Sequence, residues 1–364
     1  MNGPSPTPPP GRPEANLVTS LPVLSLEPVD RIVVLWIGRL GDFLLATPFI
    51  HALRERFPKA RITAIVGERG SEAARLCPDV DEVLTLRHAG HPLAGLRLAA
   101  RLAAERCDLL VDLNSAFSRA STALAWLSRA RVKVAFRKPT GNGVFTRTID
   151  APAETEHMLD RYARLAQAIG APYEPRLRVR VSEAAALAGR RALYKALGTA
   201  SPGSGPPSGD IVLIHPGNFK KFDNRWPEEK FVALTDRILD LPGILPVYMA
   251  GPGEEKPVRE IIARLKRPVP WLKPMSLGAL AGALRHARLL IVNATGTAHL
   301  AAALDVPTFT FLSGYTKTVW MPKTGPHHFL VSSSWESCRD IGVDEAWAAI
   351  SPLLARPAPA KSER

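Results

Sequence analysis

A glycine-containing turn early in the chain presents a carboxylate that could act as a base. The turn Gly38-Arg-Leu-Gly-Asp42 follows a short apolar run and precedes a helical pattern at 42–57. Its glycines permit a tight turn and close approach of a ligand, and the lack of a closing Gly-Lys-Ser/Thr step excludes a P-loop. We expect Asp42 to be the helix N-cap. Its carboxylate would either cap free amides or take a proton from a bound hydroxyl.

A second loop has the composition of a diphosphate clamp. It runs from His215 to Arg225, and its small and basic members include Gly217, Asn218, Lys220 and Lys221. Pro227 fits the first turn of the next helix, so the loop leads into a helix start, which favours anions. The plainer alternative is a solvated basic loop.

A third segment, 293–299, also lies between a predicted strand and a predicted helix. Thr295, Gly296 and Thr297 offer hydroxyls and free amides at that helix start, which again suits a phosphate group. Thr297 could instead be only an N-cap, and His299 could be a buried core histidine with a satisfied ring. Between this segment and the loop at 215–225, Glu254 lies in a Gly-Pro-Gly-Glu turn that taken alone is a weak signal.

The net charge points to an anionic partner. The chain has 47 lysines and arginines against 34 aspartates and glutamates, a net charge of +13. A dense basic run extends from Arg129 to Arg147 with no acid before Asp150, and it predicts either an anion-binding surface or a solvated basic face. Aromatic residues are only 7% and are not interleaved with this run, so stacking on nucleic acid is not indicated.

Cysteine usage and hydropathy exclude several other classes. The three cysteines, Cys77, Cys107 and Cys338, are far apart with no CxxC spacing, which argues against a disulfide framework and a local zinc site and fits a reducing compartment. Because no run of about 18 uninterrupted apolar residues occurs, we expect a cytoplasmic protein with no membrane span. We expect no metal ion and no nucleic-acid partner.

The alternation of short apolar strands with helices predicts parallel sheets covered on both faces. Strands are expected at 32–36, 61–66, 82–86, 108–113, 132–136, 211–215, 244–250, 289–292 and 308–312. The fold class is α/β, with two Rossmann-like, doubly wound domains facing a central cleft. We divide the chain into a disordered Pro-rich leader at 1–29, an N-terminal domain at 30–198, a linker at 199–209, a C-terminal domain at 210–342, and a terminal helix and tail at 343–364.

The motifs taken together resemble glycosyltransferase family 9, the ADP-heptose:lipopolysaccharide heptosyltransferases. The likeness covers about residues 31–350 and rests on an ordered set of pieces. These are IVVLWIGRLGDFLLATPFIHALRERFP, PDVDEVL, HPGN…RWPEEKF, AGPGEE, MSLGALAGALRHARLLIVNATGTAHLAAAL and FLSGYTKTVWMP. The family has the GT-B fold, and its C-terminal domain holds most of the nucleotide.

The resemblance implies roles for individual residues. Asp42 is similar to the family's catalytic base, and Glu254 to an acid that contacts the nucleotide ribose. The resemblance further implies a donor site that includes Gly217, Asn218, Lys220, Lys221, Met275, Thr295, Gly296, Thr297 and His299, and an acceptor site that includes Arg137 and Lys138. The implied reaction is inverting transfer of a sugar, heptose in the family, to a lipopolysaccharide core or related glycan. The co-substrate would be ADP-heptose, with peripheral contact to the inner membrane.

Two positions depart from the family pattern. Ala294 stands where the family usually has Asp, and Asn224 where it commonly has Lys. Lys220 or Lys221 could reach the same phosphates, whereas Ala294 has no substitute nearby. Two alternatives therefore remain, a transferase of this family with a different donor sugar and a non-catalytic protein that binds nucleotide sugars.

Overall fold

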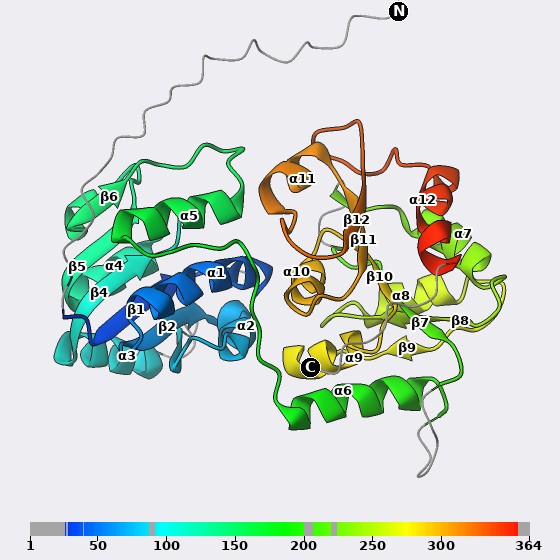
Figure 1. The fold of residues 1–364 in the computed structure, drawn as a ribbon, viewed down its shortest axis with the longest axis horizontal. Helices are drawn as coiled ribbons and strands as arrows, with labels where there is room; N and C mark the ends of the chain where they lie inside the picture. Colours follow the sequence, from blue (N-terminus) through cyan, green and yellow to red (C-terminus); the bar gives the residue numbers. More distant parts are fainter. Residues whose placement is uncertain are drawn as a thin grey trace, which may run out of the picture.

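The computed structural model describes residues 26, 28–38, 40–86, 92–199, 207–219 and 224–355, which form two α/β halves side by side (Figure 1). Each half is built on a parallel sheet of six strands, flanked by helices. The predicted fold class of two Rossmann-like domains is therefore confirmed.

The N-terminal half contains every strand that the sequence predicts in it, together with an edge strand at 147–149 that was not predicted. In chain order its elements are β1 (Arg31–Trp36), α1 (Leu40–Arg56), β2 (Arg61–Gly67), α2 (Ser71–Leu76), β3 (Glu82–Leu86), α3 (Pro92–Ala104), β4 (Arg106–Asp112), α4 (Arg119–Leu127), β5 (Arg129–Phe136), β6 (Arg147–Ile149) and α5 (Met158–Ile169). A further helix, α6 (Glu183–Ala196), follows an extended segment.

The C-terminal half repeats the pattern. Its elements are β7 (Asp210–His215), α7 (Glu228–Ile238), β8 (Ile244–Met249), α8 (Glu255–Ile262), β9 (Trp271–Leu272), α9 (Leu277–Leu284), β10 (Leu289–Asn293), α10 (Gly296–Ala303), β11 (Thr308–Leu312), α11 (Gly314–Trp320), β12 (His327–Val331) and α12 (Val343–Ala355).

The two sheets have the same strand order. The first runs β3-β2-β1-β4-β5-β6 and the second β12-β11-β10-β7-β8-β9, which is the same order when β7 is counted as the first strand. The order reverses between β1 and β4 and again between β7 and β10, and ligands bind outside the carboxyl ends of strands at such points. The turns after β1, β7 and β10 are the three loops singled out by sequence.

Burial explains why these runs form central strands and helices. Five of the six residues of β1 are buried, because helices cover both faces of the sheet and each face needs an apolar contact. On α1, the predicted stripe of Ala46, Ile50 and Leu53 is fully buried. The helix therefore packs as its 3.6-residue periodicity predicts.

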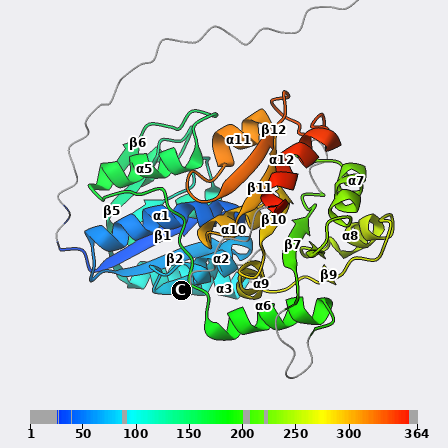
Figure 2. The same cartoon turned by 45° about the vertical axis from the view of Figure 1, so that its right-hand side comes forward.

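The boundary between the halves is not at residue 198, where we expected it. The chain crosses to the second half along the extended segment 171–182, and α6 then packs along α9 (Figure 2). A side chain at Gly189 of α6 would overlap the Ala279 carbonyl oxygen at 1.9 Å, so the two helix backbones touch. Sequence periodicity shows which side of a helix is buried but not which half it packs against. The residues of α6 were therefore placed in the N-terminal domain, although the helix packs on the C-terminal half. The predicted linker lies mostly outside the described residues.

Packing against the core begins a few residues before residue 30, where we expected the N-terminal domain to start. Leu26 and Val29 are buried in the core of the N-terminal half, and Arg131 donates a hydrogen bond to the Pro28 carbonyl oxygen at 2.7 Å. The rest of the leader lies outside the described residues. At the other end, the predicted terminal helix is α12, which packs against α7. Within the described ranges, no helix is both long and apolar enough to cross a bilayer.

Specific contacts hold the two halves together. Glu72 of α2 accepts a hydrogen bond from the Leu277 amide at 2.6 Å, which satisfies a free amide at the start of α9. His157 bonds the Met321 carbonyl oxygen at 2.7 Å through Nε2, and α1 packs against α10. These contacts place the carboxyl edges of the two sheets on either side of one cavity.

Candidate active site

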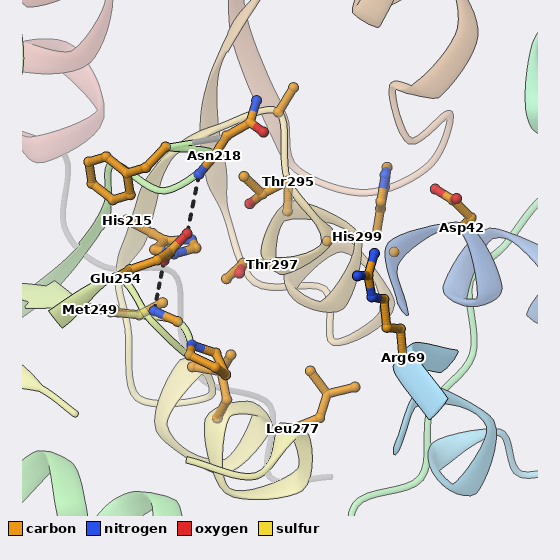
Figure 3. A pocket seen from close by; sticks show the side chains of 18 of the residues that line it. Asp42, Arg69, His215, Asn218, Met249, Glu254, Leu277, Thr295, Thr297 and His299 are labelled. Carbon is orange, nitrogen blue, oxygen red and sulfur yellow. Dashed lines mark hydrogen bonds and ion pairs between the residues drawn. The ribbon is translucent and has the colours of Figure 1, made fainter. Parts of the chain in front are cut away.

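The cavity between the halves has a volume of about 1170 Å³. Its walls come from the start of α1, the loops after β2, β7, β8 and β10, and the helices α9 and α11. Figure 3 shows Asp42, His299 and Arg69 at one end and His215, Glu254 and Asn218 at the other, with Thr295 and Thr297 between them. A cavity of this size suits a nucleotide sugar, since ligand sites are typically about 300–1,000 Å³.

Asp42 lines the cavity, but it is not the helix N-cap that we expected. α1 begins at Leu40, so Asp42 lies inside its first turn, where a carboxylate is favoured by the free amides of the helix start. Its side chain points into the cavity toward His299 (Figure 3). The helix extends further toward the glycine turn than the periodicity indicated, because Leu40 and Gly41 also adopt helical geometry.

The starts of α1 and α10 meet across the domain interface. A Cβ on Gly41 would lie 2.8 Å from the Gly296 Cα and 3.2 Å from the His299 ring. Only glycine allows this approach, because any other side chain would displace backbone. Two helix N-termini from different domains therefore converge on the place where Asp42 enters the cavity.

The start of α10 carries polar atoms that lack a partner. Thr295 is the N-cap, but its side chain caps no amide, and its Oγ1 is buried without a hydrogen-bond partner among the described residues. Thr297, which we considered as an N-cap, lies inside the helix and lines the cavity. Buried polar groups in folded proteins are almost always paired. An unpaired hydroxyl beside a helix start therefore fits a site that a polar ligand completes.

His299 is neutral in this environment. Burial, with smaller contributions from His157 and His327, lowers its pKa to about 4. Its Nδ1 also has no hydrogen-bond partner in the described part of the chain. The core-histidine alternative with a satisfied ring therefore does not hold, and His299 faces Asp42 in the cavity.

Glu254 organises the loop after β7. Burial by itself raises the pKa of this carboxyl, but bonds from His215 and from the Gly251 and Asn218 amides outweigh burial and hold the pKa below its usual value. His215 Nε2 lies 2.9 Å and the Gly251 amide 2.8 Å from Oε2, whereas the Asn218 amide bonds Oε1 at 3.3 Å. Oε1 thus keeps one lone pair for a ligand hydroxyl.

The loop itself has an unusual backbone. Asn218 adopts a left-handed conformation with φ of 77°, which asparagine tolerates better than most residues, and its side-chain amide donates to the Asn224 carbonyl oxygen. Gly217 lies beside His215, where a Cβ would approach Nε2 to 2.5 Å; it shapes the loop and does not line the cavity. Lys220 and Lys221 lie outside the described residues.

An apolar wall closes the far side of the cavity. It contains Met249 and Leu272 at the ends of β8 and β9, together with Met275, Leu277 and Leu280 around the start of α9. A flat nucleobase could bury its faces against such a wall. Met275 was identified from the sequence, but the other four were not, because apolar residues in a predicted strand or helix give no signal of a ligand.

Arg69 is a functional candidate that the sequence analysis missed. It is exposed on the loop after β2 and lines the cavity below Asp42 and His299 (Figure 3). The rule that ligands bind beyond the carboxyl ends of parallel strands could have identified it. Ala294, at the end of β10, also lines the cavity.

The predicted acceptor pair, Arg137 and Lys138, is corrected in part. Lys138 is buried and forms an ion pair with the buried Asp112, so its ammonium is not available to an acceptor. Lys138 lies just after β5, next to the exposed Arg137, and its side chain points inward to Asp112. Arg137 lies 3.6 Å from Asp150, and both side chains are exposed.

The described residues contain no group of three or more His, Cys, Asp or Glu side chains arranged to hold a metal ion. Helix starts, hydroxyls and cationic side chains of the kinds just described can stabilise negative charge in this cavity.

Comparisons with known proteins agree with this architecture. The sequence pattern of glycosyltransferase family 9 (heptosyltransferase) matches residues 95–340. A Haemophilus influenzae protein with the name "Putative glycosyltransferase" is 25% identical over 293 residues, which span 78% of this chain and 82% of that protein. The crystal structure of a glycosyl transferase family 9 protein from Veillonella parvula aligns with a TM-score of 0.79 at 20% identity, over 91% of this chain and 99% of that one. The E. coli heptosyltransferase WaaC with ADP aligns with a TM-score of 0.69 at 18% identity, over 89% and 99% of the two chains.

Proposed function

The chain belongs to glycosyltransferase family 9 and is a glycosyltransferase, and from this premise we propose that it moves a heptose, with inversion, from ADP-heptose to a lipopolysaccharide core or related anionic glycan. The observation that carries the proposal is the convergence of Asp42 and the start of α10 in one cavity (Figure 3). A carboxylate that could accept a proton and a helix start that could hold a diphosphate thus face the same space.

In the proposed reaction, Asp42 accepts the proton of the attacking acceptor hydroxyl. The hydroxyl oxygen forms a bond to the anomeric carbon while the bond from that carbon to the diphosphate oxygen breaks on the opposite side. ADP leaves with the bonding electron pair. The free amides of α10 and the hydroxyls of Thr295 and Thr297 stabilise the charge that develops on the diphosphate. The proposed step uses no metal ion.

The nucleotide lies between the apolar wall and the loop held by Glu254 in this proposal. The base packs against Met249, Leu272 and Leu277, and the free lone pair of Glu254 accepts a hydrogen bond from the ribose. Adenine as the base is supported by the similar heptosyltransferase whose structure contains ADP. Arg69 and Arg137 are the cations that we propose for the acidic groups of the acceptor.

A nucleotide panel tests the donor. We expect isothermal calorimetry to show ADP binding more tightly than UDP, GDP or CDP, because the apolar wall discriminates by base shape. Equal affinity for all four would contradict an ADP-linked donor. Binding of ADP without release of ADP from ADP-heptose, in the presence of lipopolysaccharide-core acceptors, would favour the non-catalytic alternative.

The base is tested by Asp42→Asn. The amide keeps the shape of the side chain but cannot accept the proton, so we expect turnover to fall by roughly 10²-fold or more while ADP affinity is retained. Glu68→Gln is the matched control, since Glu68 is an exposed acid on the same cavity wall. Turnover of Asp42→Asn equal to that of the control variant would remove Asp42 from the mechanism.

The alternative of a different donor sugar is supported by one feature, the methyl group of Ala294 in the cavity wall, at a position where the family usually has Asp. We include in the proposal a cytoplasmic location and a peripheral contact with the inner membrane, where a lipid-linked acceptor would be presented.

A further inference from the structure

Two large apolar side chains project from the layer formed by α3 and α4. Trp126 is 69% exposed and Leu96 is 65% exposed, more than any other large apolar side chain among the described residues. The two helices contact each other and cover one face of the first sheet, since Leu98 of α3 and Leu124 of α4 belong to the same buried cluster. Leu96 and Trp126 therefore point away from the core on the outer side of one layer.

The same layer is strongly basic. Neither α3 nor α4 contains an acidic residue. Four exposed arginines lie on these helices or on the strands next to them, namely Arg97 on α3, Arg119 on α4, and Arg106 and Arg129 at the starts of β4 and β5. Within the described ranges, none of the four forms an ion pair.

The acids that border this layer are already engaged. Glu105, which follows α3, pairs with Arg101 at 2.7 Å and with Arg31 at 3.6 Å. Asp108 accepts hydrogen bonds from the Asp30 and Arg31 amides at 2.9 and 3.0 Å. The layer therefore presents apolar side chains together with arginines whose charge is not neutralised locally.

We infer that this surface, the α3–α4 face (Leu96, Arg97, Arg106, Arg119, Trp126 and Arg129), docks on an anionic lipid bilayer. Tryptophan and leucine partition into the boundary between headgroups and acyl chains, and clustered arginines are attracted to anionic headgroups. The inference names the surface that makes the membrane contact included in the proposed function. It rests on the proposed function only for the identity of the bilayer.

The position of the face is compatible with access to the cavity. The first sheet separates the α3–α4 layer from α1. Val33 and Leu35 of β1 face the buried cluster that contains Leu98 and Leu124, whereas Val34 faces the core shared with α1. The contacts between the halves described above come from α1, α2 and the start of α5, which packs against α1. All of these lie on the opposite side of that sheet. Docking through α3 and α4 thus leaves the cavity free.

A second copy of the chain is the less suitable occupant. A symmetric dimer would place the same patch on both sides of the interface, so the four arginines would face four arginines with no acid on either helix. Such like-charge contact is unfavourable, whereas a layer of anionic headgroups supplies the opposite charge.

Vesicle co-sedimentation of the full chain tests the inference. We expect binding to phosphatidylcholine vesicles that contain phosphatidylglycerol, little binding to phosphatidylcholine alone, and loss of binding as salt is raised. The Trp126 emission should shift to the blue on binding, a shift that is absent in Trp126→Ser. Binding that does not depend on phosphatidylglycerol would overturn the inference.

Two matched pairs of variants test whether vesicle binding depends on the α3–α4 face or only on the apolar surface and net charge of the whole protein. We expect Trp126→Ser with Leu96→Ser to weaken binding by about tenfold or more, whereas Phe329→Ser, an exposed aromatic of the other half, should not. Arg97→Glu with Arg129→Glu should abolish binding, whereas Arg190→Glu with Arg191→Glu on α6 changes the net charge equally and should have little effect. Equal losses within either pair would refute the assignment.

Two readouts keep the outcome clear. ADP affinity should be unchanged in every variant, because all these residues lie outside the cavity lining; loss of ADP affinity in one variant would exclude that variant as misfolded. A wild-type dimer that Trp126→Ser converts to a monomer, with no vesicle binding by either, would overturn the inference and assign the face to self-association. Failure of the wild type to bind ADP would contradict the proposed function alone.

Discussion

The close contact between Gly41 and Gly296 predicts a strong effect of adding one methyl group. In Gly41→Ala the new Cβ would lie 2.8 Å from the Gly296 Cα, whereas ordinary contacts begin at 3.4 Å. The obstacle is backbone in the opposite domain and cannot rotate away. The starts of α1 and α10 must therefore separate by about 0.6 Å or more, which increases the distance between Asp42 and any donor held by α10.

That separation should reduce turnover more than it affects nucleotide binding. Misplacement of a reacting group by about 1 Å costs roughly 10²-fold in rate, so we expect turnover of ADP-heptose to fall between about tenfold and 10²-fold. ADP affinity should change little, because most of the proposed nucleotide contacts come from the C-terminal half alone. The measurements are steady-state release of ADP and calorimetric titration with ADP.

Gly95→Ala is the matched control for this experiment. Gly95 also lies inside a helix, and an added Cβ there meets nothing within 4 Å. Both substitutions gain about 0.5–1 kcal/mol of helix stability, so the steric contact is the difference between them. If Gly41→Ala turns over as fast as Gly95→Ala, the two helix starts do not need this approach, and the argument from their convergence fails.

Three further predictions concern other parts of the site and its support. Burial lowers the pKa of His299 to about 4 from about 6.5 in the unfolded chain, so the unfolded state binds more protons between these pH values and the free energy of unfolding should fall by about 2 kcal/mol from pH 6.5 to 5. Urea unfolding of the wild type and of His299→Gln checks this, and an equal pH slope in both proteins would contradict it. Lys138→Met leaves Asp112 charged and buried and should destabilise the fold by about 3–5 kcal/mol, whereas loss of the exposed Arg137 by Arg137→Ala should cost less than about 1 kcal/mol, and chemical denaturation distinguishes the two. Ala294→Asp should raise selectivity for ADP-heptose over ADP by about 1–3 kcal/mol if the wild-type donor is a different sugar; tight, heptose-selective binding by the wild type would show that Ala294 carries no such meaning.

Local patterns were sufficient for the central strands of both sheets and for the loops that carry the chemistry, but not for the edge strands β6, β9 and β12. The apolar run ending at Trp36 and the stripe on α1 predicted a buried strand and helix, because a strand covered on both faces and a helix packed on one side leave distinct periodicities. The turns after β1, β7 and β10 were identified in the same way, since glycines and polar residues at helix starts have local causes. The family resemblance added the role expected of Asp42.

Other features depend on contacts between residues far apart in the sequence, and local patterns do not encode these. The direction in which Lys138 points, the covering of α9 by α6, and the partner that Glu254 finds in His215 all arise when separate segments pack. The same holds for Arg69, which no motif marks. Charge and residue type determined the basic run and predicted an anion-binding site. Only the tertiary structure decided which charges are buried in pairs, which remain exposed, and that Gly41 and Gly296 bring two helix starts to one cavity, because these outcomes depend on contacts between distant segments.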